Sequence, residues 1–126
     1  MAMTRAIDMI RNIKSLYNSL GRHGLFTDQI DMLVTHERLL RRLGEKSCNG
    51  EISEENYEEG EKRHLEGVQC VLDEFNKGKN REDRFFFYHQ TDPRGCALYL
   101  ILGADWDAAG KSVDSRYNTI GIAVCY

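Results

Sequence analysis

The sequence predicts an α+β fold in which three helices pack on a C-terminal three-stranded antiparallel sheet. Through residues 1–76, apolar side chains recur at three- and four-residue spacing, which is the periodicity of amphipathic helices. Residues 84–126 instead contain short aromatic and β-branched runs separated by turn-forming residues, a pattern typical of antiparallel strands. Because the two patterns are segregated along the chain, we expect the helices to cover one face of the sheet within a single domain spanning 1–126.

The composition is that of one ordinary globular domain. The chain has 126 residues, of which 41% are hydrophobic and 29% are charged, so disordered and low-complexity classes are excluded. No apolar run approaches the roughly 18 residues that a membrane-spanning helix needs. Residues 1–8 also lack a signal-peptide pattern, and we therefore expect a soluble protein of the cytoplasm.

An amphipathic helix is predicted from about Thr4 to Leu20. Its apolar face is formed by Met3, Ile7, Ile10, Ile13, Tyr17 and Leu20. Gly21 and Gly24 mark its end, because a residue without a Cβ atom readily adopts the left-handed conformation that closes a helix.

A second helix is predicted from Asp28 to Leu43, with Thr27 as its N-cap and Gly44 as the residue that ends it. The short connection to the first helix predicts an antiparallel helical hairpin. Positive charge in the last turns complements the helix dipole, and it is carried by Arg38, Arg41 and Arg42. These arginines could contact phosphates, but the acidic stretch that follows them disfavours direct nucleic-acid binding.

A polar loop at 44–52 leads to the third predicted helix, which is capped by Ser53 and ends near Asn76. Two glycines, Gly60 and Gly67, interrupt this helix and lower its intrinsic stability. They imply one of two arrangements. Either the helix bends at these positions, or a neighbouring element approaches it closely there.

Three strands are predicted in the rest of the chain. Residues 84–90 and 96–102 are aromatic or apolar runs of strand length, and residues 117–126 supply the last strand. Between the first two lies Thr-Asp-Pro-Arg-Gly at 91–95, in which Asp, Pro and Gly occupy the positions they prefer in a type I turn. The first two strands are therefore expected to form a hairpin.

Aromatic side chains are too frequent in the last third of the chain for one buried sheet face to hold them all. They are Phe85, Phe86, Phe87, Tyr88, Tyr99, Trp106, Tyr117 and Tyr126. One interpretation is a binding surface or homodimer contact on the second face of the sheet, since Tyr and Trp are favoured interface anchors. The other is a third layer, in which the predicted polar loop at 103–116 covers that face.

The net charge of −3 is distributed unevenly along the chain. Residues 1–46 carry +3, residues 47–76 carry −7 and residues 77–126 carry +1. A row of carboxylates on one helix suits a positively charged partner, although a solvated helix face is the simpler alternative. The predicted partner-binding residues are Glu54, Glu55, Glu58, Glu59 and Glu61, which form the electrostatic contact. Further predicted contact residues are Tyr57, Arg94 and Trp106.

The predicted hairpin also offers a catalytic alternative. Cys96 would be the nucleophile and His89 its base, while Asp92 or Arg94 would orient the base or stabilise charge. Packing between facing strands explains the same residues, and no oxyanion hole is indicated. We therefore expect no catalytic residues, and this site remains the alternative.

Metal and cofactor binding are not expected. The four cysteines form no Cys-x-x-Cys pair, which leaves a mixed site of His89, Cys96 and Cys125 as the one conceivable zinc arrangement. None of the 11 glycines belongs to a phosphate-binding glycine motif. The predicted site therefore contains neither a metal nor a cofactor.

Two C-terminal stretches form a specific pattern, namely YHQTDPRGCALY at 88–99 and YNTIGIAVC at 117–125. Together with the Tyr17-Asn18 pair of the first helix, they resemble small uncharacterised accessory proteins of tailed phages and prophages. The resemblance implies a protein that acts in the cytoplasm of an infected bacterium. Such proteins are often inhibitors of host defence, including anti-CRISPR and anti-restriction factors. The predicted function is therefore non-enzymatic inhibition of a host protein or nucleoprotein complex that has a basic surface.

Overall fold

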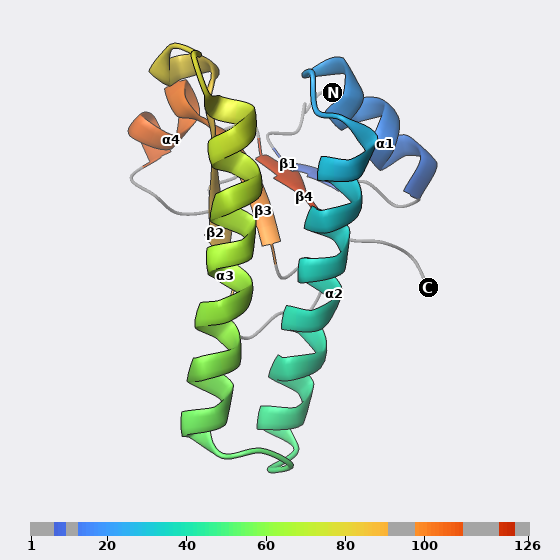
Figure 1. Ribbon diagram of the computed structural model, residues 1–126, viewed down its shortest axis with the longest axis vertical. Helices are drawn as coiled ribbons and strands as arrows, with labels where there is room; N and C mark the ends of the chain where they lie inside the picture. Colours follow the sequence, from blue (N-terminus) through green and yellow to red (C-terminus); the bar gives the residue numbers. More distant parts are fainter. Residues whose placement is uncertain (1–6, 10–12, 91–97, 110–118, 123–126) are drawn as a thin grey trace.

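The computed structural model describes residues 7–9, 13–90, 98–109 and 119–122, and these form an α+β fold (Figure 1). Two long helices run side by side in front of the strands, as predicted for a layer of helices on one face of a sheet. A short helix packs on the opposite face. No helix in these ranges is both long and apolar enough to cross a membrane.

The long pair of helices is α2, Thr27–Cys48, and α3, Glu54–Asn76, which follows a first helix α1, Ile13–Arg22. The predicted cap of α3 is confirmed, because the Ser53 hydroxyl oxygen accepts a hydrogen bond from the Asn56 backbone N–H at 3.1 Å. Residue Thr27 is the first residue of α2 and not its cap. The helix instead starts with the Phe26 backbone N–H donating to the Gln29 side chain at 2.9 Å, because the glutamine side chain reaches back to an otherwise unpaired donor.

Glycines in the left-handed conformation end both α1 and α2. Gly24 has φ +103° and lies where the sequence predicts the end of the first helix. The prediction that Gly44 ends the second helix is wrong, because α2 continues to Cys48 and Gly44 is buried within it. The residue that ends the helix is instead Gly50, which has φ +72°. The Gly50 N–H donates to the Ser47 carbonyl, and the Glu51 N–H donates to the Lys46 carbonyl. These two bonds satisfy the last helical carbonyls, which otherwise lack partners.

The first strand, β1, Ile7–Met9, corrects the prediction of a continuous helix from Thr4. It pairs in parallel with β4, Thr119–Gly121, over three residues. Residues 7–9 fit both periodicities, since Ile7 and Met9 also alternate around Asp8 as in a strand. Pairing covers the edge that β4 would otherwise leave open, which is a tertiary effect that helical spacing cannot anticipate.

The three C-terminal strands form the antiparallel sheet that the sequence predicts. Strand β2, Phe85–His89, pairs with β3, Leu98–Leu102, from Phe85 opposite Leu102 to His89 opposite Leu98. Strand β3 pairs in turn with β4, and the order across the sheet is β1-β4-β3-β2. The predicted turn at 91–95 lies outside the described residues.

The predicted polar loop at 103–116 is wrong in its first half, where the chain forms a helix, α4, Gly103–Ala109. This helix starts directly after β3, which ends at Leu102. The Gly103 N–H donates to the Arg84 carbonyl at 2.8 Å and ties the start of α4 to the residue before β2. Its Trp106 ring stacks on Phe86 of β2, with centroids 5.4 Å apart. This short helix therefore supplies a third layer over the second face of the sheet.

The core lies between the helices and the first face of the sheet. Its buried side chains are Leu16, Leu20, Leu25, Ile30, Leu33, Val34, Val68, Val71, Leu72, Phe75, Phe85, Leu98, Leu100, Ile120 and Ile122. On the second face, Tyr99 and Ile101 are buried as well. Strand alternation explains the division, since neighbouring residues of β2 and β3 point to opposite layers.

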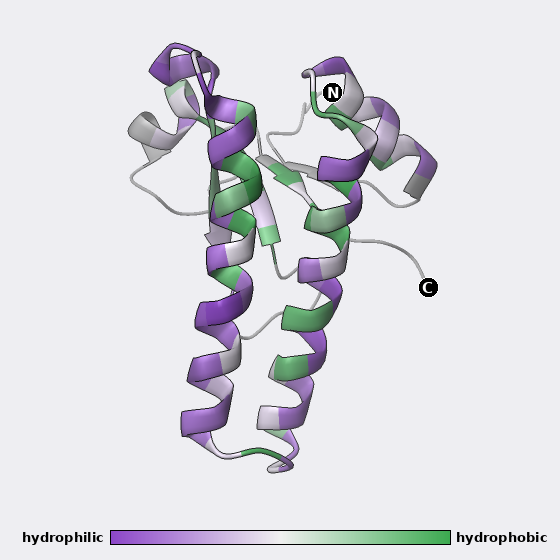
Figure 2. Ribbon diagram, in the orientation of Figure 1, coloured by the Kyte–Doolittle hydropathy of each residue, from purple (hydrophilic) through white to green (hydrophobic). Residues whose placement is uncertain are grey.

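The glycines of α3 mark a close approach to α2 and not a bend. A Cβ atom at Gly60 would lie 2.8 Å from Cδ2 of Leu43, and one at Gly67 would lie 2.5 Å from Nε2 of His36. Both positions therefore face α2, and the helix continues through them without a break. In Figure 2, each of the two helices α2 and α3 has its hydrophobic residues on one side and its hydrophilic residues on the other.

Candidate functional site

An exposed acidic face lies on the first turns of α3. We define it by the four exposed side chains Glu54, Glu55, Glu58 and Glu59. Their spacing of one, three and four residues places them on one broad side of the helix, close to the turn that joins α2 to α3 (Figure 2). Within the described part of the chain, their one ion pair joins Glu59 to Arg63 at 3.3 Å, between two exposed side chains. Most of this negative charge is therefore available to a partner.

Two other residues predicted for the same contact, Tyr57 and Glu61, turn inward. Both are partly buried, and the Tyr57 hydroxyl donates a hydrogen bond to Oε2 of Glu61 at 3.3 Å. The same oxygen lies 2.9 Å from Nδ1 of His89 on β2. The sequence pattern predicted Glu61 and His89 in separate sites, and the structure brings them together.

The environment of this buried group shifts two pKa values. Burial raises the pKa of Tyr57 to about 12, and the neighbouring Glu61 carboxylate adds to the effect, so the phenol stays protonated. Burial lowers the pKa of His89, while the Glu61 carboxylate acts in the opposite direction. The side chain of His89 is 7% exposed, which explains why burial dominates.

The geometry at His89 resembles the orientation of a general base. A carboxylate that accepts the Nδ1–H of an imidazole holds the ring in one tautomer and leaves Nε2 as the electron-pair donor. The other residues of the catalytic alternative, Asp92, Arg94 and Cys96, lie outside the described residues. In the ranges that the structure covers, no three His, Cys, Asp or Glu side chains cluster as a metal site.

The predicted anchor Trp106 is partly buried on the second face of the sheet. Its indole stacks on the Phe86 ring with an angle of 16° between the planes, and the Arg81 guanidinium lies 4.9 Å from the same ring. Electrostatic attraction between a cation and the face of an aromatic ring stabilises such a contact, in addition to the gain from burying the ring. The arrangement joins α4, β2 and the 3-10 turn at Arg81–Asp83 into one layer.

A pair of histidines lies between α2 and α3 that was not predicted from the sequence. His36 and His64 face each other with their Nδ1 atoms 3.2 Å apart, and both rings are partly buried. Burial lowers the pKa of both imidazoles, with a further contribution from His64 for His36 and from Arg63 for His64. The signal was the glycine at position 67, because only a residue without a side chain leaves room for the His36 ring.

Acidification is expected to destabilise the protein through His36 and His64. In the unfolded chain each imidazole binds a proton near its ordinary pKa of about 6.5, whereas the folded state lowers that pKa. Their contribution to stability is therefore complete above this pH and decreases as the pH falls below it. Urea denaturation at about pH 7.5 and about pH 5.5 measures the loss, which should be smaller in the double variant His36→Gln, His64→Gln. Equal losses in both proteins would contradict the prediction.

The arginines of α2 line a shallow hollow. Arg38, Arg41, Arg42 and Glu45 surround a space of about 220 Å³. One of the three, Arg41, also pairs with the fully buried Glu37 through a contact of 2.6 Å. That pairing compensates a buried carboxylate, so Arg41 has a structural role in addition to its place on the surface.

The described chain thus combines an exposed acidic face on α3, a partly buried Tyr57–Glu61–His89 group beneath it, and an arginine hollow on α2. Comparison with models of known protein families, with curated proteins and with solved structures finds no match. Among the three features, the acidic face is the one whose charged side chains are all exposed and all carry the same sign.

Proposed function

We propose that the protein is a non-enzymatic inhibitor that binds a positively charged surface of a bacterial host protein or nucleoprotein complex. The acidic face of α3 makes the contact. The observation that carries the proposal is the exposure of its four carboxylates on two successive turns of a capped helix. Complementary charge of this kind speeds association and selects partners with the opposite sign.

The packing beneath the acidic face supports its use as a rigid recognition element. Glu61 and Tyr57 lie inward of the face, where their contact with His89 ties the first half of α3 to β2. A preformed helix loses little conformational entropy when it binds, so more of the contact energy appears as affinity. The resemblance to phage accessory proteins suggests a defence system of the CRISPR or restriction type as the target.

Neutralising the acidic face is expected to abolish inhibition. In the variant Glu54→Gln, Glu55→Gln, Glu58→Gln, Glu59→Gln, four charge contacts are lost, and affinity for the target should fall about tenfold or more. The measurement is the plating efficiency of a phage on bacteria that carry a defence system active against it and that express the protein. Expression of the original chain should raise it, and expression of the variant should not.

A matched control separates local from overall charge. The variant Glu66→Gln, Asp73→Asn, Glu74→Gln, Glu82→Gln removes four exposed carboxylates elsewhere and changes the net charge equally. It should inhibit as well as the original chain. If both quadruple variants behave alike, the acidic face is not the binding surface.

A second candidate function is a small enzyme or ligand-binding domain centred on His89, with Cys96, Asp92 and Arg94. The observation that favours it is the Glu61 carboxylate at 2.9 Å from Nδ1 of His89, because a positioned base requires such a partner. The same plating assay separates the two functions. Loss of inhibition in Cys96→Ser, with unchanged stability, would favour the enzyme, whereas a binding protein tolerates this change.

A further inference from the structure

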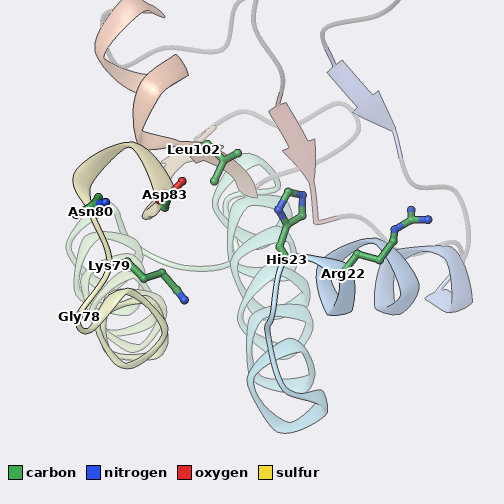
Figure 3. Close-up of a pocket in the computed structure, with 7 residues that line it drawn as sticks. All are labelled: Arg22, His23, Gly78, Lys79, Asn80, Asp83 and Leu102. Carbon is green, nitrogen blue, oxygen red and sulfur yellow. The ribbon is translucent and has the colours of Figure 1, made fainter.

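A second polar site lies at the end of the molecule where α1 and α3 terminate. A hollow of about 460 Å³ opens there between the end of α1 and the segment that links α3 to β2 (Figure 3). It is lined by Arg22, His23, Gly78, Lys79, Asn80, Asp83 and Leu102. This volume is within the range of small-molecule sites. Its lining is mostly polar, and Leu102 is the one apolar side chain among the lining residues.

The wall formed by residues 78–83 is held in place by hydrogen bonds from the backbone and from the side chains of Arg84 and Asn76. The Lys79 N–H donates to the Asn76 carbonyl at 3.0 Å, and the Lys79 carbonyl accepts from Nε of Arg84 at 2.8 Å. The Asn76 side chain in turn bonds both the N–H and the carbonyl of Phe85, at 2.8 and 2.9 Å. The wall is therefore preorganised, which reduces the entropy lost when a ligand binds.

The charged groups of the hollow favour an anion. The Lys79 ammonium lies 4.5 Å from the centre of the Phe75 ring. In Figure 3 the Lys79 side chain extends from the 78–83 segment toward the side of the hollow where His23 lies. Arg22 stands at the rim with its guanidinium directed away from Lys79. Among the described residues neither cation forms an ion pair, and Asp83 is the one carboxylate in the lining. Positive charge thus exceeds negative charge by one.

We propose that this hollow binds a small phosphorylated molecule that also carries hydroxyl groups, such as a sugar phosphate. The phosphate is bound by Lys79, with the Asn80 amide and the His23 imidazole as further hydrogen-bond donors and Arg22 as a second positive charge at the rim. A lysine ammonium suits this role because it acts as a compact point charge. The Asp83 carboxylate accepts hydrogen bonds from hydroxyl groups of the sugar. Inorganic phosphate has no sugar hydroxyl groups and therefore cannot make these bonds.

The site is independent of the acidic face. The two lie at opposite ends of α3, whose 23 residues span roughly 34 Å at 1.5 Å per residue. A failure of one proposal therefore leaves the other intact, and the assays do not overlap.

Titration of the full chain with ribose 5-phosphate, inorganic phosphate and ribose, followed by backbone amide NMR shifts, tests the proposal. Ribose 5-phosphate should shift the amides of His23, Lys79 and Asn80 and bind more tightly than inorganic phosphate, while ribose alone should cause no shifts. Lys79→Gln should weaken binding about tenfold, because a charge-assisted hydrogen bond is lost. The control Lys62→Gln, a charge change at an exposed position of α3, should leave affinity unchanged.

A second variant keeps the test decisive if Lys79→Gln alters the fold. Asp83→Asn removes the one negative charge of the lining, so it should strengthen binding of inorganic phosphate and reduce the preference for ribose 5-phosphate over it. Thermal unfolding of each variant establishes that the fold is retained. Absence of shifts at millimolar ligand, equal weakening by Lys62→Gln, or shifts confined to the arginine hollow of α2 would each overturn the proposal.

Discussion

Replacing Phe85 by alanine is expected to lower the free energy of unfolding by about 3–5 kcal/mol. The side chain is 1% exposed, and its ring lies 5.6 Å from the ring of Phe75 and 5.2 Å from that of His23. It therefore joins β2 to α3 and to the end of α1, and truncation would leave a cavity at this junction. Urea denaturation followed by circular dichroism measures the loss.

A second phenylalanine of the same chain provides the control. Phe26 is 74% exposed at the start of α2, and its hydrogen bonds to that helix come from its backbone, whose N–H donates to the Gln29 side chain and whose carbonyl accepts from the Ile30 N–H. Phe26→Ala should therefore change stability by less than about 0.5 kcal/mol. Similar losses in the two variants would mean that Phe85 is not a core residue.

Gly103→Ala is the second change with a large expected effect, at about 1–3 kcal/mol or more of lost stability. A Cβ atom at this position would lie 1.9 Å from the Arg81 carbonyl oxygen and 3.2 Å from Cα of Glu82. Both are backbone atoms, which cannot move aside as a flexible side chain would. The start of α4 or the 3-10 turn must shift, and the stacking of Trp106 on Phe86 would be disturbed.

The single tryptophan makes this disturbance measurable, because Trp106 reports on the contact between α4 and β2. Gly103→Ala should shift its fluorescence toward that of an exposed indole and lower the urea midpoint. Gly21→Ala is the matched control, since a Cβ atom there meets nothing within 4 Å and alanine favours a helix by up to about 1 kcal/mol. A stable Gly103→Ala protein with unchanged fluorescence would contradict the close contact of α4 with the 3-10 turn.

Local signals located α3 and β2 well. The serine cap and the apolar spacing located α3 to within a residue of its observed start at Glu54, and the aromatic run located β2. Both depend on interactions between residues close in the chain, namely a side-chain cap, a helical stripe or a strand repeat. The same reasoning correctly limited the meaning of Gly60 and Gly67 to two alternatives, of which packing selected one.

The errors lie where local pattern does not determine the structure. The sequence predicted a stop at Gly44, but Gly44 is buried inside α2, and the observed stop is Gly50, which has a positive φ. Residues 7–9 suited a helix or a strand, and the open edge of β4 decided between them. Propensity is a weak prior in such cases, because tertiary contacts outweigh the small differences between conformations.

For the site, the distribution of charge along the sequence revealed the acidic character of α3, since its glutamates lie close together in the chain. Which of those glutamates face outward depended on the packing of α3 against β2, where Glu61 meets His89 across 28 positions of sequence. The His36–His64 pair and the hollow beside Lys79 are also contacts between distant segments. Helical periodicity and charge act locally and can be read along the chain, whereas the partners of a buried polar group exist only once the elements have packed together.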